Sequence, residues 1–367
     1  MKVIRDEIAA LAPYHVQDAK GFIKLDAMEN PYDFPEALRE GLAARLRDAA
    51  INRYPDAAAG TLKMAVRRAL GVSADLDILL GNGSDEIIQM IALAAAKPGA
   101  AVMSLEPAFV MFKMIATFCG LRYIGVPLTV DFEIDVEATV AAVKRHQPAV
   151  IFIAYPNNPT GNLFDHDAIH AIISAASGLV VIDEAYFAFS SRSFLENIHR
   201  YPNVVLMRTV SKLGLAGLRL GMLIGRKQWL DEFDKVRLPY NINVLTQVAA
   251  TYALDNIGHF KAQTDTLMAG RQAMAAALEQ LFAAHPSARK FPSEANFILI
   301  RLPRGMGMGT AQAVFESLRA QKILVKNTSA AHPLLHDTLR ITIGTPAENH
   351  AFLAALVIAL AASPNKA

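Results

Sequence analysis

The stretch LDILLGNGSDEIIQMIALAAAKPGAAVMSL, residues 76–105, decides the fold class. It contains a short apolar run (76–81), a segment with a helical pattern (84–96) and a second short apolar run (100–105). Another helical segment and another strand-like run follow over residues 111–128. Strand-like and helical segments that alternate in this way predict a parallel sheet with helices on its faces.

Further apolar runs extend the pattern along the chain. They are AVIFIAY (149–155), GLVVIDEAY (178–186), NVVLMRTV (203–210) and LRLGMLIG (218–225). Their apolar residues are nearly continuous rather than alternating, which is typical of strands that are buried on both faces. We therefore expect an α/β protein whose large domain has a mostly parallel central sheet flanked by helices.

The C-terminal part of the chain predicts a second unit. A long helical connector, residues 243–281, precedes three strand-like runs and a helix between residues 296 and 344. This order indicates a smaller α+β unit, and 367 residues are enough for two domains. We expect residues 46–275 to form the large domain, and residues 1–45 and 276–367 to form an N-terminal arm and the small domain.

Composition favours small-molecule chemistry over a polyanionic partner. Lys and Arg number 36 against 34 Asp and Glu, which gives a net charge of +2, and no run of five like charges occurs. We therefore expect no nucleic-acid partner. Cys119 is the single cysteine, and the first ten residues lack the apolar core of a signal peptide, so we expect a cytoplasmic protein. The longest apolar run, about residues 351–362, is too short for a bilayer and predicts a buried helix.

The segment GNGSDE, residues 81–86, joins a predicted strand to a predicted helix through glycines. The free amide groups of the first helical turn can bind an anion such as a phosphate. The segment also has a purely structural interpretation. Ser84 can cap the helix, with Asp85 and Glu86 stabilised by the helix dipole.

Polar residues follow two other apolar runs, where ligands bind in open α/β sheets. AYPNNPTG, residues 154–161, is a turn after a buried strand, and an Asn side chain there can donate a hydrogen bond to a ring oxygen or a carboxylate. Asp183 ends the run LVVI. A carboxylate that leaves a buried strand needs a cation or a donor, which is either a ligand or a neighbouring arginine.

RTVSKLGLAGLRLG, residues 208–221, carries the candidate nucleophile. Ser211 and Lys212 end a predicted strand among apolar and small residues, and Arg219 follows seven residues after the lysine. Most lysines are solvated surface groups. Desolvation and nearby positive charge lower the pKa of a lysine and free its amine to attack a carbonyl carbon.

Together these segments resemble the class I and II aminotransferases, which have the pyridoxal-5'-phosphate (PLP) fold type I. The resemblance rests on PNNPTG, on an Asp-x-x-Tyr whose Asp lies 25 residues after Asn158, and on a Ser-Lys whose Lys lies 29 residues after Asp183. It implies that Lys212 forms a Schiff base with PLP and then transfers the substrate proton. It also implies that Asp183 pairs with the pyridinium nitrogen and that Asn158 and Tyr186 bind the 3'-oxygen.

The same resemblance places the rest of the cofactor. Phe109 is expected to stack on the cofactor ring. The family commonly has eight residues from the lysine to the arginine, whereas this chain has seven. The cofactor phosphate is expected to be held by Ser84, Asp85, Ser211 and Arg219.

Other segments resemble the histidinol-phosphate aminotransferases more narrowly. They are LDAMENPY (25–32), RYPD (53–56), GNGSDEII (81–88), LPYNIN (238–243), NTSAAHPLL (327–335) and LRITIGT (339–345). This likeness implies a homodimer with shared active sites, in which Tyr54 reaches the cofactor phosphate of the other subunit. It also implies transamination between histidinol phosphate and 2-oxoglutarate, giving imidazole acetol phosphate and glutamate in histidine biosynthesis. An aromatic amino-acid aminotransferase and a threonine-phosphate decarboxylase remain alternatives on this fold.

The substrates set a chemical requirement on the site. Histidinol phosphate carries a phosphate monoester where glutamate carries a carboxylate, so one pocket must accept either anion. Arg340, in LRITIG, suits both because its guanidinium forks onto two oxygens, although a surface salt bridge is its other interpretation. Lys326 is expected to be a solvated lysine, and His332 and His336 are not expected to bind a metal because Pro333 interrupts a helix there. Further substrate-side candidates are Tyr14, Asn30, Asn82 and Tyr240.

Overall fold

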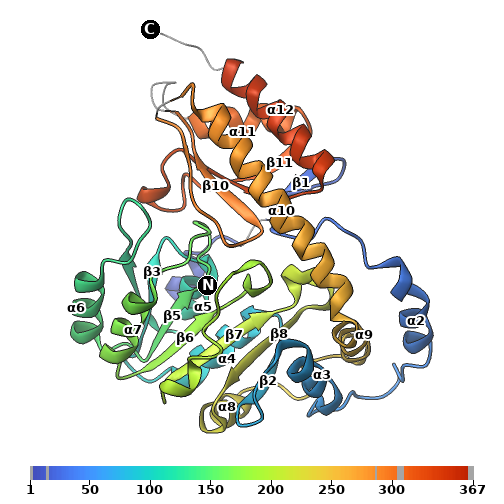
Figure 1. Cartoon of the computed structure of the whole chain (residues 1–367). Helices are drawn as coiled ribbons and strands as arrows, with labels where there is room; N and C mark the ends of the chain where they lie inside the picture. Colours follow the sequence, from blue (N-terminus) through green and yellow to red (C-terminus); the bar gives the residue numbers. More distant parts are fainter. Residues whose placement is uncertain (1–2, 14–15, 286, 304–309, 363–367) are drawn as a thin grey trace.

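The computed structural model describes residues 3–13, 16–285, 287–303 and 310–362. In this part of the chain the strands form two sheets, a seven-stranded one below and a five-stranded one above in Figure 1. The larger sheet has the order β2-β8-β7-β6-β5-β3-β4. Its strands are β2 (Asp77–Asn82), β8 (Leu220–Gly225), β7 (Val204–Thr209), β6 (Leu179–Asp183), β5 (Val150–Ala154), β3 (Ala101–Glu106) and β4 (Arg122–Pro127).

The prediction of a mostly parallel sheet is confirmed. Strands β4, β3, β5, β6 and β7 run parallel to one another, and β8 runs antiparallel to both β7 and β2. The carboxyl ends of the parallel strands therefore meet at one edge of the sheet. Because β8 is reversed, its first residue, Leu220, lies at that same edge opposite Asn82.

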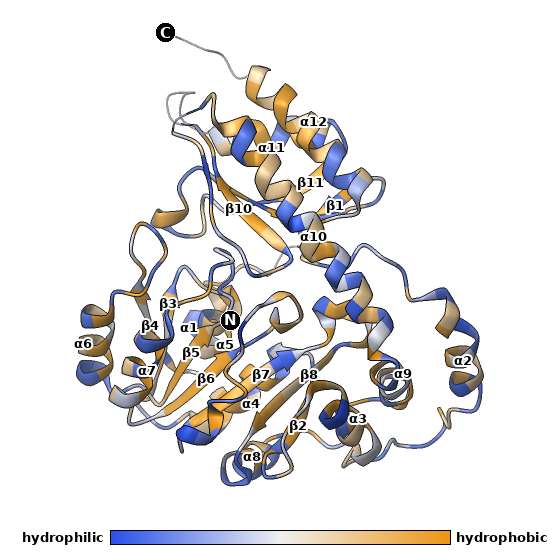
Figure 2. Cartoon of the chain, in the orientation of Figure 1, coloured by the Kyte–Doolittle hydropathy of each residue, from blue (hydrophilic) through white to orange (hydrophobic). Residues whose placement is uncertain are grey.

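The strands of the larger sheet are buried on both faces, as their continuous apolar runs predict. Ile151 and Ile153 of β5 belong to one apolar core, whereas Phe152 and Ala154 belong to another on the opposite face. Figure 2 shows these strands in orange between the flanking helices. Helices α3 (Gly60–Leu70), α6 (Val136–His146), α7 (His166–Ala175) and α9 (Val244–Asp255) contribute to the first core, and α4 (Ser84–Ala95), α5 (Val110–Phe118) and α8 (Lys227–Asp234) contribute to the second.

The smaller sheet is mixed and has its own apolar core. Its strands, in order, are β1 (Ile23–Leu25), β11 (Ile323–Asn327), β12 (Thr338–Thr342), β10 (Phe297–Arg301) and β9 (Arg289–Lys290). Strand β1 pairs in parallel with β11, so the N-terminal segment joins the C-terminal unit. Helices α10 (Ile257–Phe282), α11 (Thr310–Ala320) and α12 (Pro346–Ala362) pack on this sheet.

Two expectations about the helices need correction. The predicted long connector is two helices, because α9 ends before Asn256 and α10 begins after it. The C-terminal run is a helix, as expected, but only one of its faces is buried. Phe352 and Leu356 pack into the core, whereas Val357 and Ile358 are at least half exposed. Within the described residues, no helix is long and apolar enough to span a membrane.

The remaining helical elements are α1, α2 and five 3-10 turns. Helix α1 (Asp6–Ala9) lies beside α5, where Arg5 donates a hydrogen bond to the carbonyl oxygen of Phe118 (2.6 Å). Helix α2 (Glu36–Arg47) packs against α9. Single 3-10 turns are η1 (Phe187–Phe189), η2 (Ile198–Arg200), η3 (Ser211–Leu213), η4 (Ala216–Leu218) and η5 (Pro333–Leu335).

Candidate active site

A cavity of about 120 Å³ opens at the edge of the larger sheet where the parallel strands end. The lining residues come from the ends of β5, β6 and β7 and from the start of α4. They include every cofactor-side residue predicted from the sequence except Tyr54. The lining is Met28, Ser84, Asp85, Phe109, Ala154, Pro156, Asn158, Asp183, Ala185, Tyr186, Thr209, Ser211, Lys212 and Arg219.

Lys212 lies in η3, three residues after β7 ends. Burial, together with the nearby guanidinium of Arg340, lowers the pKa of its amine to about 8. The amine donates a long hydrogen bond (3.4 Å) to the carbonyl oxygen of Ala27. An amine with a pKa of about 8 has a far larger neutral fraction at neutral pH than an ordinary lysine, and this neutral form can attack a carbonyl carbon.

Asp183 is the last residue of β6 and is 4% exposed. Its carboxylate accepts one hydrogen bond, from the backbone N–H of Ala185 (3.0 Å). Burial raises the pKa of Asp183 to about 7, and the charges of Asp85 and Glu184 act in the same direction. A buried carboxyl group with so few donors suits a protonated ring nitrogen, which would restore its negative charge.

Tyr186 and Asn158 complete the polar side of the cavity. Tyr186 is buried edge-on against Phe297, with 5.2 Å between ring centroids, and burial raises the pKa of its hydroxyl. The hydroxyl therefore stays protonated and can donate a hydrogen bond. Asn158 accepts a hydrogen bond from Arg340 (2.5 Å), so its amide N–H₂ group is the end left to donate into the cavity.

The opposite end of the cavity is built to approach an anion closely. Gly83 has a φ of 84° just before α4 begins at Ser84. A Cβ atom on Gly221 would lie 2.7 Å from the Ser84 amide nitrogen, and one on Gly83 would lie 2.5 Å from the Arg219 guanidinium. The two glycines therefore let β8 and Arg219 close around the start of the helix, where free amide groups point outward.

The charges at this end are partly paired. The Arg219 guanidinium lies 3.7 Å from a carboxylate oxygen of Asp85. Burial raises the pKa of Asp85, and Arg219 opposes that shift. The Thr209 hydroxyl donates a hydrogen bond to the Ser211 hydroxyl (2.9 Å), which orients it. Two serine hydroxyls, a guanidinium and helix amides are the donor set that a phosphate dianion needs.

A second cavity of about 290 Å³ adjoins the first and shares Met28, Phe109 and Asn158 with it. Arg340 lines this second cavity and is 8% exposed. Its guanidinium donates to Asn158 and to the carbonyl oxygen of Asp26 (3.0 Å). The surface interpretation of Arg340 is therefore wrong. Lys326, expected to be solvated, is half-buried and lines the same cavity.

The family model described as aminotransferase class I and II matches residues 20–356. The chain belongs to the class I and II aminotransferases. Histidinol-phosphate aminotransferase 2 of Cupriavidus pinatubonensis is 49% identical over 364 residues, covering 98% of this chain and 97% of that protein. The histidinol-phosphate aminotransferase of Chromobacterium violaceum is 51% identical over 355 residues, 97% of each chain.

Solved structures agree with this membership. The histidinol-phosphate aminotransferase of Sinorhizobium meliloti, solved in complex with pyridoxal-5'-phosphate, superimposes with a TM-score of 0.85 at 25% identity over 98% of each chain. The one from Clostridium acetobutylicum has a TM-score of 0.80 at 22% identity, covering 91% of this chain and 97% of that one. The expected PLP fold type I is therefore confirmed for this aminotransferase.

Several predicted site residues of this aminotransferase lie outside both cavities. Asn30 donates to the Leu213 carbonyl oxygen (3.3 Å) and to Gln263 (3.1 Å). Asn82 is exposed at the end of β2. Tyr54 and Tyr240 stack on each other at 4.5 Å, and Tyr54 is 81% exposed. Tyr14 lies outside the described residues.

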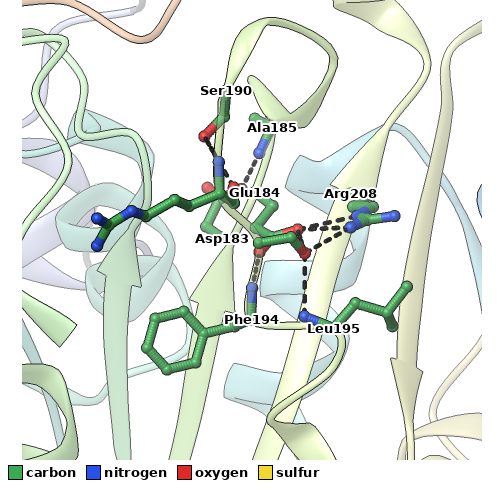
Figure 3. Close-up of polar contacts among 9 residues, drawn as sticks. Asp183, Glu184, Ala185, Ser190, Phe194, Leu195 and Arg208 are labelled. Carbon is green, nitrogen blue, oxygen red and sulfur yellow. Dashed lines mark hydrogen bonds and ion pairs between the residues drawn. The ribbon is translucent and has the colours of Figure 1, made fainter.

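The alternative in which Asp183 pairs with a neighbouring arginine is wrong. In this aminotransferase the arginine pairs with the next residue, Glu184. Glu184 is fully buried and accepts two hydrogen bonds from Arg208 of β7, at 2.8 and 3.0 Å (Figure 3). Asp183 is thereby left to face the cavity. Three residues of the site were not predicted from the sequence: Glu184 as the partner of Arg208, and Thr209 and Glu106 as lining residues. Glu106 ends β3, so the strand-end rule that found Asp183 would also have found it.

Proposed function

We propose that this aminotransferase uses PLP to transfer an amino group between histidinol phosphate and 2-oxoglutarate, giving imidazole acetol phosphate and glutamate in histidine biosynthesis. The observation that carries this proposal is that relatives about half identical over nearly the whole chain are histidinol-phosphate aminotransferases. The cavity supports it, since an amine of lowered pKa and a carboxyl group of raised pKa face the same space.

The cavity residues fit the cofactor in shape and charge. Lys212 would hold it through its amine, and Asp183 would lie beside the ring nitrogen. Asn158 and Tyr186 would donate to the 3'-oxygen, and Phe109 would cover the ring face. When bound, the cofactor withdraws electrons from the substrate α-carbon.

The phosphate of the cofactor would lie at the start of α4. Ser84, Ser211 and the free helix amides would donate to its oxygens, and Arg219 would balance its charge. The Asp85 carboxylate lies 3.7 Å from the Arg219 guanidinium, so the role of Asp85 would be to hold this guanidinium in place. The left-handed backbone of Arg219, with a φ of 49°, directs this side chain back toward Gly83.

The chemical step would use Lys212 as the base and acid. Its amine, with a pKa of about 8, can accept a proton from the substrate α-carbon and return it at a neighbouring atom. Arg340 would bind the anionic end of either substrate, carboxylate or phosphate. Because Arg340 is held by Asn158 and by the Asp26 carbonyl group, it is oriented before the substrate arrives. Asn30, Asn82, Tyr14 and Tyr240 would contribute to the substrate side of the assembled site.

We also propose a homodimer with shared active sites, in which Tyr54 of one subunit reaches the cofactor phosphate of its partner. The exposure of Tyr54 within one chain supports this role, because it leaves the side chain free to reach a partner subunit. The separate cores of the two sheets support two domains, for which the proposed bounds are 46–275 for the large one and 1–45 with 276–367 for the small one. A single cysteine agrees with a cytoplasmic location.

The test is an assay of the purified, PLP-loaded protein with histidinol phosphate and 2-oxoglutarate, with glutamate as the product measured. We expect glutamate to form and phenylalanine to be a poor donor; the opposite result would transfer the assignment to an aromatic amino-acid aminotransferase. Lys212→Ala should lose turnover and the visible absorption of the bound cofactor. Lys235→Ala, which removes an exposed lysine paired with Glu232, is the matched control.

A further inference from the structure

Three polar residues at one end of the second cavity have no part in the function proposed above. They are Glu106, Tyr123 and His332, and we call them the Glu106 cluster. Glu106 ends β3, Tyr123 lies in the neighbouring strand β4, and His332 directly precedes η5 of the small-domain segment. The cluster thus lies where the two sheets face each other, in a cavity that shares Phe109 and Asn158 with the cofactor cavity.

The position of the Glu106 carboxylate is set by a glycine. Gly125 of β4 pairs with Ser104 of β3, two residues before Glu106. Any side chain at position 125 would overlap the Glu106 carboxyl group. The carboxylate therefore lies directly against the backbone of β4, and its side chain is about one quarter exposed.

The other two members of the Glu106 cluster are neutral groups. Burial lowers the pKa of His332, whose Nε2 lies 3.9 Å from Glu106, although the carboxylate opposes that shift. The ring of His332 is therefore predominantly neutral at pH 7. Burial raises the pKa of Tyr123, and the Glu106 charge adds to the effect, so that hydroxyl stays protonated next to Ser104 (2.6 Å).

The second cavity is lined by more cationic than anionic side chains. Of its lining residues in the described part of the chain, Glu106 alone carries a carboxylate, whereas Lys113, Lys326 and Arg340 carry positive charges. Histidinol phosphate offers a group of each kind, a phosphate for the cations and an imidazole N–H donor for the carboxylate. A benzene ring offers no such donor, so the carboxylate would lose contact with water and gain no hydrogen bond from the ring.

We propose that Glu106 is a specificity-determining residue that accepts a hydrogen bond from the N–H of the substrate imidazole, with Tyr123 and His332 closing around the ring. This inference rests on the proposed function, because it takes histidinol phosphate as the amino donor. It deepens that function by naming how the site distinguishes an imidazole from a benzene ring. A site built to bond an N–H rejects analogues that lack one far more strongly than a purely apolar pocket does.

The experiment compares two amines that differ only in the ring. Histidinol phosphate and phenylalaninol phosphate share the amine and the phosphate ester, so the ratio of their kcat/KM values measures ring recognition alone. We expect the PLP-loaded wild-type enzyme to prefer histidinol phosphate, and Glu106→Gln to reduce that preference by about 10- to 100-fold. The change should appear mainly in the KM for histidinol phosphate, since Glu106 contacts the ring and not the reacting carbon.

Two further variants make the result decisive. Glu106→Asp keeps the charge but shortens the side chain, and it should retain more of the preference than Glu106→Gln. Glu137→Gln makes the same chemical change at an exposed residue of α6 and should leave the ratio at the wild-type value. Both amines are measured on one preparation, so partial misfolding cancels in the ratio.

The outcomes separate this inference from the function on which it rests. If the wild type prefers histidinol phosphate and Glu106→Gln keeps the wild-type ratio, the role of Glu106 is wrong while the proposed function stands. If the wild type does not transaminate histidinol phosphate at all, the proposed function fails and the inference fails with it. A reduced ratio in Glu106→Gln with an unchanged ratio in Glu137→Gln supports the inference.

Discussion

Glu184 and Arg208 form a buried ion pair directly behind the cavity, with 2.8 Å between Nη2 of the arginine and Oε2 of the glutamate. Glu184 follows Asp183 at the end of β6, and Arg208 precedes Lys212 by four residues on β7. The pair therefore ties together the two strands that deliver the cavity's carboxyl group and its amine (Figure 3). Its remaining hydrogen bonds reach the loop after η1, through the Phe194 amide (2.5 Å) and the Ser193 hydroxyl (3.0 Å).

Removing one member of this pair should be costly. Arg208→Met leaves the Glu184 charge buried without its partner, and we expect the free energy of unfolding to fall by about 3–5 kcal/mol. The double variant with Glu184→Leu removes both charges and should recover most of that loss. Denaturant unfolding measures the free energy of unfolding of the single and the double variant. The control is Arg39→Met, which breaks an exposed pair with Glu36 and should lower the free energy of unfolding by less than about 1 kcal/mol. A mild effect of Arg208→Met would mean that water or a rearranged loop compensates the glutamate.

The raised pKa of Asp183 predicts a pH dependence of stability in the cofactor-free protein. Its folded pKa of about 7 lies above the ordinary value of 3.8. Between these values the folded state holds a proton that the unfolded state has released, so this stabilisation is full below pH 4 and is lost as the pH rises through 7. The integrated change is about 4 kcal/mol.

The comparison with Asp183→Asn isolates that contribution. As the pH rises from 4.5 to 7.5, the free energy of unfolding of the wild type should fall relative to that of Asp183→Asn. The control is Asp167→Asn at an exposed position, whose free energy of unfolding should change with pH as that of the wild type does. Unfolding is measured at each pH. A difference that stays constant over this range would show that Asp183 keeps its ordinary pKa in the folded protein.

The close approach of β8 to the start of α4 gives a prediction about cofactor affinity. Gly221→Ala would place a methyl group 2.6–2.7 Å from the backbone of Gly83 and Ser84, so the helix start must shift. We expect PLP to bind at least ~10-fold more weakly, because overpacking by one methyl group costs about 1–3 kcal/mol. Gly217→Ala is the control, since nothing lies within 4 Å of a Cβ there. Equal affinities for the two variants in a fluorescence titration would contradict the tight contact.

Much of the site was predictable because it depends on short sequence segments. Strands buried on both faces are recognisable as continuous apolar runs, and ligands in such sheets bind where strands end. These two rules bring together Asn158, Asp183 and Lys212 without any knowledge of the other chain segments. The same rules applied to β3 point to Glu106.

The sequence could not show which side chains far apart in the chain pair with each other, or in which direction a strand runs. Adjacent acids such as Asp183 and Glu184 read alike, and only the packing of β7 shows which one meets Arg208. The direction of β8 is hidden because a buried strand is apolar whichever way it runs. The contact of Arg340 with Asn158 joins residues 182 positions apart and depends on how the two sheets face each other.

The stacked pair Tyr54 and Tyr240 leads to a test of the shared active site. In one chain the two rings lie 4.5 Å apart and nearly parallel, with Tyr54 81% exposed and outside both cavities. If Tyr54 serves the partner's cofactor, a site needs Lys212 from one subunit and Tyr54 from the other. Lys212→Ala and Tyr54→Ala, each of low activity alone, should then complement each other when their subunits are mixed.

The mixed dimer would contain one complete site, formed by Lys212 of one subunit and Tyr54 of the other. With random exchange half of the dimers are mixed, so the activity should reach about a quarter of the wild-type value. Mixing Lys212→Ala with Asp183→Asn is the matched control, because both residues line the same cavity of one chain and no complete site can form. Recovery in the first mixture and none in the second requires a dimer that shares its sites, whereas no recovery in either would leave Tyr54 without a role across the interface.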